Sequence, residues 1–187
     1  MEYRKRIADK LLKEQLDAMG AVLVEGPKAC GKTTTAEQVA GSVLYMADPR
    51  TLQTNLQIAD TDITILLKGK TPRLIDEWQV VPQFWDAIRF TVDHRRDVGQ
   101  FILTGSAVPV SSRDIVHSGT GRFGWVTMRP MSLWESGDST GEVSLGSLFS
   151  STSQEVSGSS GMDLEHLAFL ICRGGWPSSL LARTDNA

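Results

Sequence analysis

The sequence predicts an α/β fold in which helices cover a parallel β-sheet. Two observations support this prediction. Short apolar runs alternate with amphipathic stretches along most of the 187 residues, which is typical of strand-helix-strand units. A glycine-rich segment at 26–33 also joins the first apolar run to the next helical stretch. This is the position at which many α/β proteins bind phosphate groups.

The first elements follow from the spacing of apolar residues. An amphipathic helix is predicted from about residue 4 to 18, because Ile7, Leu11, Leu12, Leu16 and Met19 recur at helical spacing. Gly20 ends this helix. The short apolar runs at 21–25 and 42–46 predict two strands, and the stretch from about 32 to 40 between them predicts a helix.

The later elements repeat the same alternation. We expect a polar helix from Asp48 to about residue 61, a strand at 73–76, a helix that begins at Pro82, and a strand at 100–104. A short helix capped by Ser111 and Ser112, a strand at 123–127 and the Leu133-Trp134 segment follow. The alternation through these segments predicts that the strands run parallel.

The composition of the chain changes near residue 136. Serine and glycine dominate residues 136–161, which predicts a loop or linker. Residues 162–172 regain apolar side chains at helical spacing, and the segment from Arg173 to Pro177 interrupts them. We therefore expect a main domain at 1–135, a linker or loop at 136–161 and the start of a helical region at 162–187.

Composition argues against several classes of protein. Hydrophobic residues make up 41% of the chain and the net charge is −3, so there is no clear signal for nucleic-acid binding. The apolar runs are too short to span a membrane. Charged residues interrupt the N-terminus where a signal peptide needs an apolar core, so we expect a cytoplasmic protein. The two cysteines, Cys30 and Cys172, lack neighbours for a disulfide framework or a zinc site.

The segment from Gly26 to Thr33 carries the strongest chemical signal. It matches the phosphate-binding pattern G-x4-G-K-[ST], and the candidate nucleotide-binding residues are Gly26, Pro27, Lys28, Ala29, Cys30, Gly31, Lys32, Thr33 and Thr34. The backbone amides of such a loop surround a β-phosphate. Lys32 is expected to reach the β- and γ-phosphates, and the Thr33 hydroxyl to ligate Mg²⁺. We interpret Cys30 as a small residue tolerated in the loop rather than as a reactive thiol.

Carboxylates and hydroxyls follow two later strands. Asp76 ends the apolar run at 73–76 and Glu77 follows it directly. The first carboxylate can hold Mg²⁺, and the second can act as the base for an attacking water. Thr104 ends the run at 100–104 and Ser106 follows two residues later. Either hydroxyl can position that water or sense the γ-phosphate. A plain turn at the end of each strand is the alternative interpretation.

One arginine stands in a glycine-rich loop before the last strand. Arg122 follows Gly119, Thr120 and Gly121, and a guanidinium on a flexible loop can neutralise charge on a transferring phosphoryl group, in its own subunit or in a neighbour. Arg113 is a second candidate. An arginine that lies on the surface without a function remains the alternative for both.

Together these segments resemble a known family. The N-terminal helix, GPKACGKTTT, RLIDEWQ, FILTGS, Gly121-Arg122, RPMSLWE and RGGWP are similar to those of bacterial and archaeal AAA-type ATPases with a DUF4143 C-terminal region. The resemblance implies a three-layer P-loop NTPase of the ASCE division with strand order 5-1-4-3-2. It also implies a Walker A motif at 26–33, a Walker B motif at 74–77, a sensor at 104–106 and a role for Arg122 as the arginine that follows the sensor.

Two features depart from the family pattern. The usual loop resembles G-P-R-Q-x-G-K-T, whereas Lys28, Ala29 and Cys30 occupy its centre here. The family's large C-terminal domain is represented only by residues 162–187, so we expect a truncated helical region.

Three functions remain open. We expect a Mg²⁺-dependent ATPase that uses its nucleotide state to switch an attached or partner domain, in a homo-oligomer or with a protein partner. A non-catalytic, ATP-gated binding module is the first alternative. A small-molecule kinase is the second, although residues 136–161 contain no arginine for a lid. ATP is favoured over GTP because no segment resembles the guanine reader Asn-Lys-x-Asp.

Overall fold

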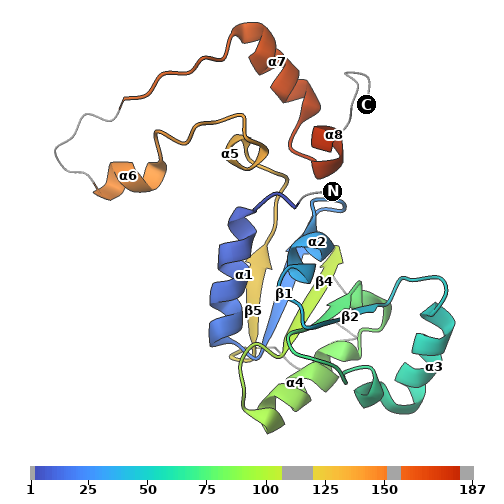
Figure 1. Cartoon of the computed structure of the whole chain (residues 1–187). Helices are drawn as coiled ribbons and strands as arrows, with labels where there is room; N and C mark the ends of the chain where they lie inside the picture. Colours follow the sequence, from blue (N-terminus) through green and yellow to red (C-terminus); the bar gives the residue numbers. More distant parts are fainter. Residues whose placement is uncertain (1–2, 107–119, 151–156, 182–187) are drawn as a thin grey trace. The chain divides into compact units, whose positions relative to one another are not determined.

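A computed structural model of the chain describes residues 3–106, 120–150 and 157–181 (Figure 1). The chain forms two compact units, one spanning Arg6–Arg129 and the other combining Met1–Lys5 with Pro130–Ala187. The helix expected at Ser111 and Ser112, and the candidate Arg113, lie outside the described residues.

The unit Arg6–Arg129 is built on a five-stranded sheet. Its strands are β1 (Ala21–Gly26), β2 (Ser42–Tyr45), β3 (Arg73–Asp76), β4 (Phe101–Ser106) and β5 (Phe123–Thr127). They lie in the order β2-β3-β4-β1-β5, and every neighbouring pair is parallel. This confirms both the parallel α/β sheet and the strand order implied by the resemblance.

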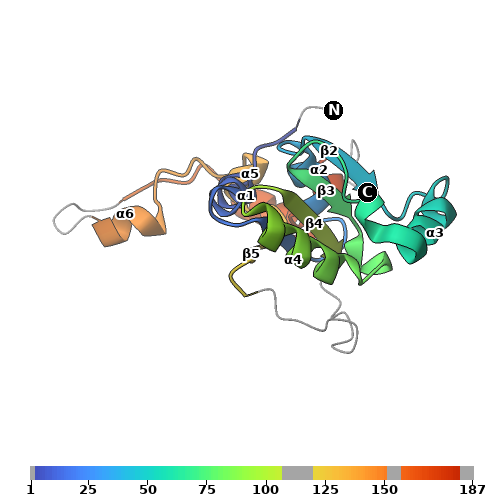
Figure 2. The same ribbon diagram turned by 90° about the horizontal axis from the view of Figure 1, so that it is seen from below.

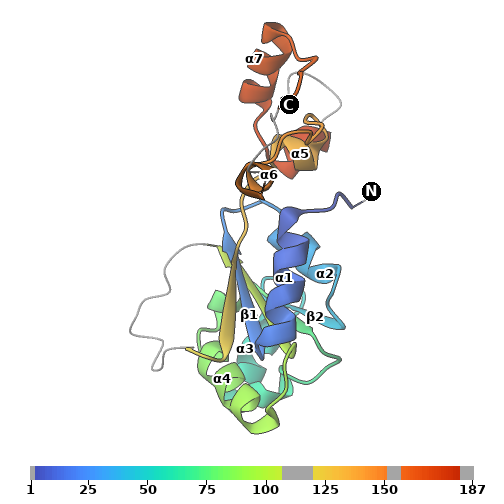
Figure 3. The same cartoon turned by 90° about the vertical axis from the view of Figure 1, so that its left-hand side faces the viewer.

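Helices cover both faces of this sheet. They are α1 (Ile7–Ala18), α2 (Lys32–Glu37), α3 (Leu52–Asp62) and α4 (Phe84–Arg95), with the 3-10 turns η1 (Ile63–Ile65) and η2 (Trp78–Val80). One buried cluster joins α1 and α2 to the sheet, and a second joins α3, η1 and α4 to it. Figures 2 and 3 show the sheet between α1 and α2 on one side and α4 on the other.

The alternation of strand side chains produces these two cores. Val22 and Val24 of β1 belong to the cluster with α1, whereas Leu23 belongs to the cluster with α4, as the two-residue period of a strand requires. In the second cluster Trp85 of α4 stacks on Phe123 of β5, with ring centroids 4.0 Å apart and an interplanar angle of 8°. Burial on both faces explains why these strands appear as continuous apolar runs in the sequence.

The sheet register sets the position of the candidate site. Asp76 at the end of β3 is the register partner of Thr104 in β4, and Gly26 at the end of β1 is the partner of Ser106. Because parallel strands present their carboxyl ends at one edge of a sheet, the three segments that carry candidate residues meet at the same edge.

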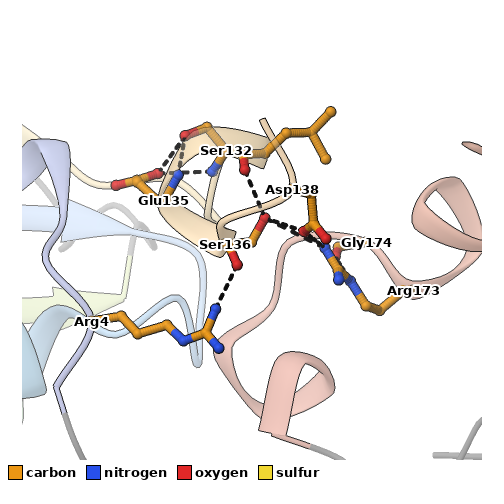
Figure 4. Close-up of polar contacts among 8 residues, drawn as sticks. Arg4, Ser132, Glu135, Ser136, Asp138, Arg173 and Gly174 are labelled. Carbon is orange, nitrogen blue, oxygen red and sulfur yellow. Dashed lines mark hydrogen bonds and ion pairs between the residues drawn. The ribbon is translucent and has the colours of Figure 1, made fainter. Parts of the chain in front are cut away.

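The unit that contains Pro130–Ala187 is helical in its described part. It contains α5 (Leu133–Ser136), α6 (Leu145–Ser150), α7 (Leu164–Arg173) and α8 (Pro177–Leu181). An ion pair of 2.6 Å joins Arg173 to Asp138 (Figure 4), and the bond from Arg173 holds the pKa of Asp138 below its usual value. Arg4 donates a hydrogen bond to the carbonyl of Ser136 at 2.5 Å.

Helix α6 lies inside the segment that was expected to be a loop or linker. The Ser144 hydroxyl accepts a hydrogen bond from the backbone N–H of Ser147 at 3.1 Å. Serine is common both in linkers and at helix N-caps, so a serine-rich composition alone did not predict this helix. In the described ranges, no helix has the length and apolar character needed to cross a bilayer.

Candidate functional site

The loop between β1 and α2 turns sharply at three positions. Gly26, Ala29 and Gly31 have φ values of 152°, 64° and 102°. Glycine adopts such angles without strain, whereas the left-handed region costs a residue such as Ala29 about 1–2 kcal/mol. Positive φ values within a short loop are typical of backbone conformations whose N–H groups converge on an anion.

Lys32 lies across this loop. Its side chain donates hydrogen bonds to the carbonyl oxygens of Gly26 and Pro27, both at 2.9 Å, although the residue is only 7% exposed. Within the described residues Lys32 forms no ion pair. A buried ammonium with neutral partners is a costly arrangement, so the loop carries a positive charge that an anionic ligand can balance.

Asp76 connects three elements at the edge of the sheet. The hydroxyl of Thr33 in α2 donates to Asp76 Oδ1 at 2.6 Å, and the hydroxyl of Thr104 in β4 donates to the same oxygen at 2.6 Å. Thr104 is 1% exposed, so its hydroxyl is fixed from within the sheet. This arrangement places a hydroxyl and a carboxylate next to the loop.

Glu77 follows Asp76 in an unusual backbone conformation. Its φ and ψ of 56° and 46° are left-handed, and it precedes the turn η2. Residues other than glycine rarely adopt this left-handed region. Strained backbone conformations of this kind concentrate at functional sites. Gln79 donates a hydrogen bond to Glu77 Oε2, so the carboxylate has a defined partner.

The donor set fits a magnesium nucleotide. Mg²⁺ is usually bound by one or two carboxylates together with phosphate oxygens and water, rather than by a protein cage. In the described parts of the chain no group of three or more His, Cys, Asp or Glu side chains could hold a metal alone. Asp76 and Thr33 therefore suit a cation that arrives with a phosphate chain.

Comparison with known families agrees with this geometry. A family model described as an AAA domain matches residues 19–136, which is more than half of the chain. The chain belongs to the AAA domain family. Family membership gives it an AAA-type P-loop ATPase domain, and hence a nucleotide-binding one. The matched region contains the loop, Asp76, Glu77 and Thr104. No curated protein matches the chain.

The fourth candidate segment, which contains Arg122, lies at the opposite end of the strands from the phosphate-binding loop. Arg122 precedes β5, and its carbonyl accepts a hydrogen bond from the N–H of Ala21 at the start of β1. The loop begins at the other end of β1, five residues later at Gly26, which is roughly 17 Å away for a strand. The structure thus brings Thr33, Asp76, Glu77 and Thr104 together at one edge and does not bring Arg122 to them.

Arg122 has a partner at its own end of the sheet. Its guanidinium forms an ion pair with Asp93 of α4 at 2.7 Å and also donates to the Thr120 carbonyl at 3.1 Å. The bond from Arg122 keeps the pKa of Asp93 below its usual value. The Arg122 side chain is 44% exposed, so it remains accessible from outside the AAA domain.

Sequence reasoning missed a further arginine, Arg6. Arg6 is 7% exposed, and it donates to the carbonyl of Cys30 in the loop at 2.8 Å and to the carbonyl of Arg129 at 2.7 Å. Its position at the start of an amphipathic helix resembles that of many surface arginines, so nothing in the local sequence indicates that Arg6 contacts the loop. Arg6 ties the start of α1 to the phosphate-binding loop of the AAA domain.

Tyr45 was also not anticipated. It ends β2 as the register partner of Asp76, and its hydroxyl donates to Glu37 Oε1 of α2 at 2.5 Å. That bond, with a smaller contribution from burial, raises the pKa of Tyr45 to about 12. The tyrosine therefore stays neutral and links β2 to the helix that follows the loop.

Proposed function

We propose that this chain is a Mg²⁺-dependent ATPase that uses its nucleotide state to switch an attached or partner domain. The observation that carries the proposal is the convergence of the Thr33 and Thr104 hydroxyls on one oxygen of Asp76, next to a loop with a buried, unbalanced Lys32. This joins the phosphate-binding loop, the acidic strand end and the next strand in one hydrogen-bonded group.

Each residue has a distinct role in this proposal. The loop amides and the Lys32 ammonium bind the β- and γ-phosphates. Thr33 and Asp76 hold the metal ion, which supplies charge neutralisation to the transferring phosphoryl group when it is bound. Glu77 takes the proton from the attacking water. Thr104 and Ser106 orient that water or respond to the γ-phosphate.

The proposal also covers the rest of the chain. We infer that the ATPase domain ends near residue 135 and that residues 162–187 begin a helical region related to DUF4143. In this proposal, exchange of ATP for ADP at the sheet edge changes the state of the helical region, to which residues 136–161 connect the ATPase domain. Separate expression of residues 1–135, with urea unfolding and nucleotide titration, tests this boundary.

A non-catalytic, ATP-gated binding module is the second candidate. It is favoured by one observation, namely that Arg122 is bonded to Asp93 at the far end of the sheet. A domain whose catalytic arginine does not reach its own phosphates would bind nucleotide but hydrolyse it slowly.

Phosphate release from the purified chain separates the two functions. We expect turnover with Mg·ATP and none with excess EDTA. Glu77→Gln should retain ATP but lower the rate by about 10²- to 10⁴-fold, because an amide cannot accept the proton from water. If the parent chain binds Mg·ATP yet releases no phosphate at any protein concentration, the binding module is correct and the ATPase is not.

A further inference from the structure

We propose that Gln79 is a positioning residue for hydrolysis, whose side-chain amide holds the Glu77 carboxylate in place at the end of β3. The inference rests on the proposed function, because it takes Glu77 to be the base. In this role Gln79 touches neither the nucleotide nor the water and acts through Glu77.

The orientation of the amide is set by its partner. A carboxylate without a proton only accepts hydrogen bonds, so Gln79 must present its NH₂ group to Glu77 Oε2. This turns Gln79 Oε1 to the opposite side, where it is buried and has no hydrogen-bond partner in the described part of the chain. A buried acceptor without a partner is unfavourable. The arrangement therefore gives the Glu77 carboxylate a hydrogen bond and leaves the Gln79 carbonyl oxygen without one.

A glycine in the next strand makes room for the amide. A Cβ at position 105 would overlap Gln79 Oε1 and would approach Trp78 Nε1 to 3.2 Å. Gly105 follows Thr104, whose hydroxyl binds Asp76. Gln79 is thus packed between the end of β3 and the end of β4, beside the residues that hold the metal and the phosphate in the proposed function.

The turn η2 delivers the amide to Glu77. Val80 N–H donates to the Glu77 carbonyl and Val81 N–H to the Trp78 carbonyl, both at 3.0 Å. Trp78 is 5% exposed and belongs to the core cluster with α4, so it anchors the turn. A side chain on such a closed turn loses little freedom when it binds Glu77, as a preorganised site requires.

The first test compares kcat with KM. Gln79→Met keeps the length of the side chain and removes the amide, and Gln79→Asn keeps the amide but is too short to reach Glu77. Both variants should lower kcat by about 10- to 100-fold, the scale of a misplaced catalytic group. KM and calorimetric ATP affinity should remain at parent values. Gln57→Met, an exposed position in α3, is the matched control and should leave kcat unchanged.

A double-mutant cycle tests whether Gln79 acts through Glu77. In the Glu77→Gln background, Gln79→Met should lower kcat no further, because the group it positions is already gone. The side-chain amide resonance of Gln79, assigned by its loss in Gln79→Met, should shift in Glu77→Gln without any nucleotide. A purely structural glutamine would instead lower kcat by the same factor in both backgrounds, which overturns the proposal.

The outcomes separate this inference from the proposed function. If Glu77→Gln hydrolyses ATP at the parent rate, the proposed role of Glu77 fails. If Glu77→Gln is inactive while Gln79→Met or Gln79→Asn keeps the parent kcat, only the positioning role of Gln79 fails. An increase in kcat in either Gln79 variant also overturns it, because the amide would then restrain Glu77.

Discussion

Lys32 forms no ion pair within the described residues, so the effect of Lys32→Ala on nucleotide affinity is simple to interpret. Lys32→Ala should weaken Mg·ATP binding by roughly 10- to 100-fold, because a hydrogen bond to a charged group contributes about 1.5–3 kcal/mol. The fold should remain, since the partners of the ammonium among the described residues are the two loop carbonyls of Gly26 and Pro27. Calorimetric titration measures the affinity, and Lys13→Ala, an exposed lysine of α1, is the control. A folded Lys32→Ala protein with the parent affinity would rule out the phosphate-binding role.

Asp76 offers a substitution that separates charge from hydrogen bonding. In Asp76→Asn the amide oxygen can still accept from Thr33 and Thr104, so the free energy of unfolding should change by less than about 1 kcal/mol. The lost charge should weaken Mg²⁺ binding, and the concentration of Mg²⁺ needed for half-maximal ATPase activity should rise by about 10-fold or more. An unchanged Mg²⁺ requirement would exclude Asp76 as the ligand. Asp76→Ala should by contrast destabilise the chain, because two hydroxyls lose their acceptor.

The residues differ in how far the sequence could reveal them. Lys32, Thr33 and Asp76 stand in short patterns at the ends of apolar runs, and the structure brings them together, while their chemical roles stay predictions. The bond between Gln79 and Glu77 depends on a left-handed backbone at Glu77 and on the space left by Gly105. The spacing of apolar residues in the sequence predicts neither feature, because both depend on how the chain packs after β3 and β4 have paired.

At the scale of elements, Arg6 connects a helix to a loop. Arg6→Met should leave the buried carbonyl of Cys30 and that of Arg129 without this donor, at a cost of about 1–3 kcal/mol for each unpaired group. Urea unfolding should show a lower midpoint, and ATP affinity should fall because the loop is less restrained. Lys5→Met, at the exposed neighbouring position, should change neither quantity. A parent-like midpoint in Arg6→Met would show that the link is not stabilising.

The elements themselves followed the physical signals that the sequence contains. The strand predicted at 73–76 and the helix predicted to begin at Pro82 agree with β3 and α4 within two residues, because glycine, proline and charged residues bound their apolar runs. Helix α6 was missed since its cap and its composition are also those of a linker. The contact of Arg6 with Cys30 spans 24 residues and could not be found from local patterns.

At the scale of the whole molecule, the alternation of strands and helices predicted a parallel sheet but not the order of its strands. The order came from the resemblance, and the structure confirms it. This order has a consequence for Arg122. Since β5 runs parallel to β1, a residue before β5 lies at the edge of the sheet opposite the phosphate-binding loop.

This placement leads to a prediction about assembly. Arg122 cannot reach the loop of its own chain in this structure, yet its side chain is 44% exposed, and its partners among the described residues are Asp93 and the Thr120 carbonyl. We predict that Arg122 acts on the nucleotide of a neighbouring copy. An arginine supplied in this way increases phosphoryl transfer by about 10³- to 10⁵-fold. The dilute chain should therefore bind ATP but hydrolyse it slowly, and the rate per molecule should rise with concentration.

Three variants test this prediction across a dilution series followed by light scattering. Arg122→Ala should bind ATP normally and keep the slow rate at every concentration. Asp93→Asn removes the charge that retains Arg122, so its rate should begin to rise at a lower concentration than that of the parent. Arg50→Ala, which removes an exposed arginine paired with Asp48, should behave as the parent does. A flat rate that is identical in the parent and in Arg122→Ala would contradict action across subunits, and the ion pair with Asp93 would then be a structural contact at the far end of the sheet.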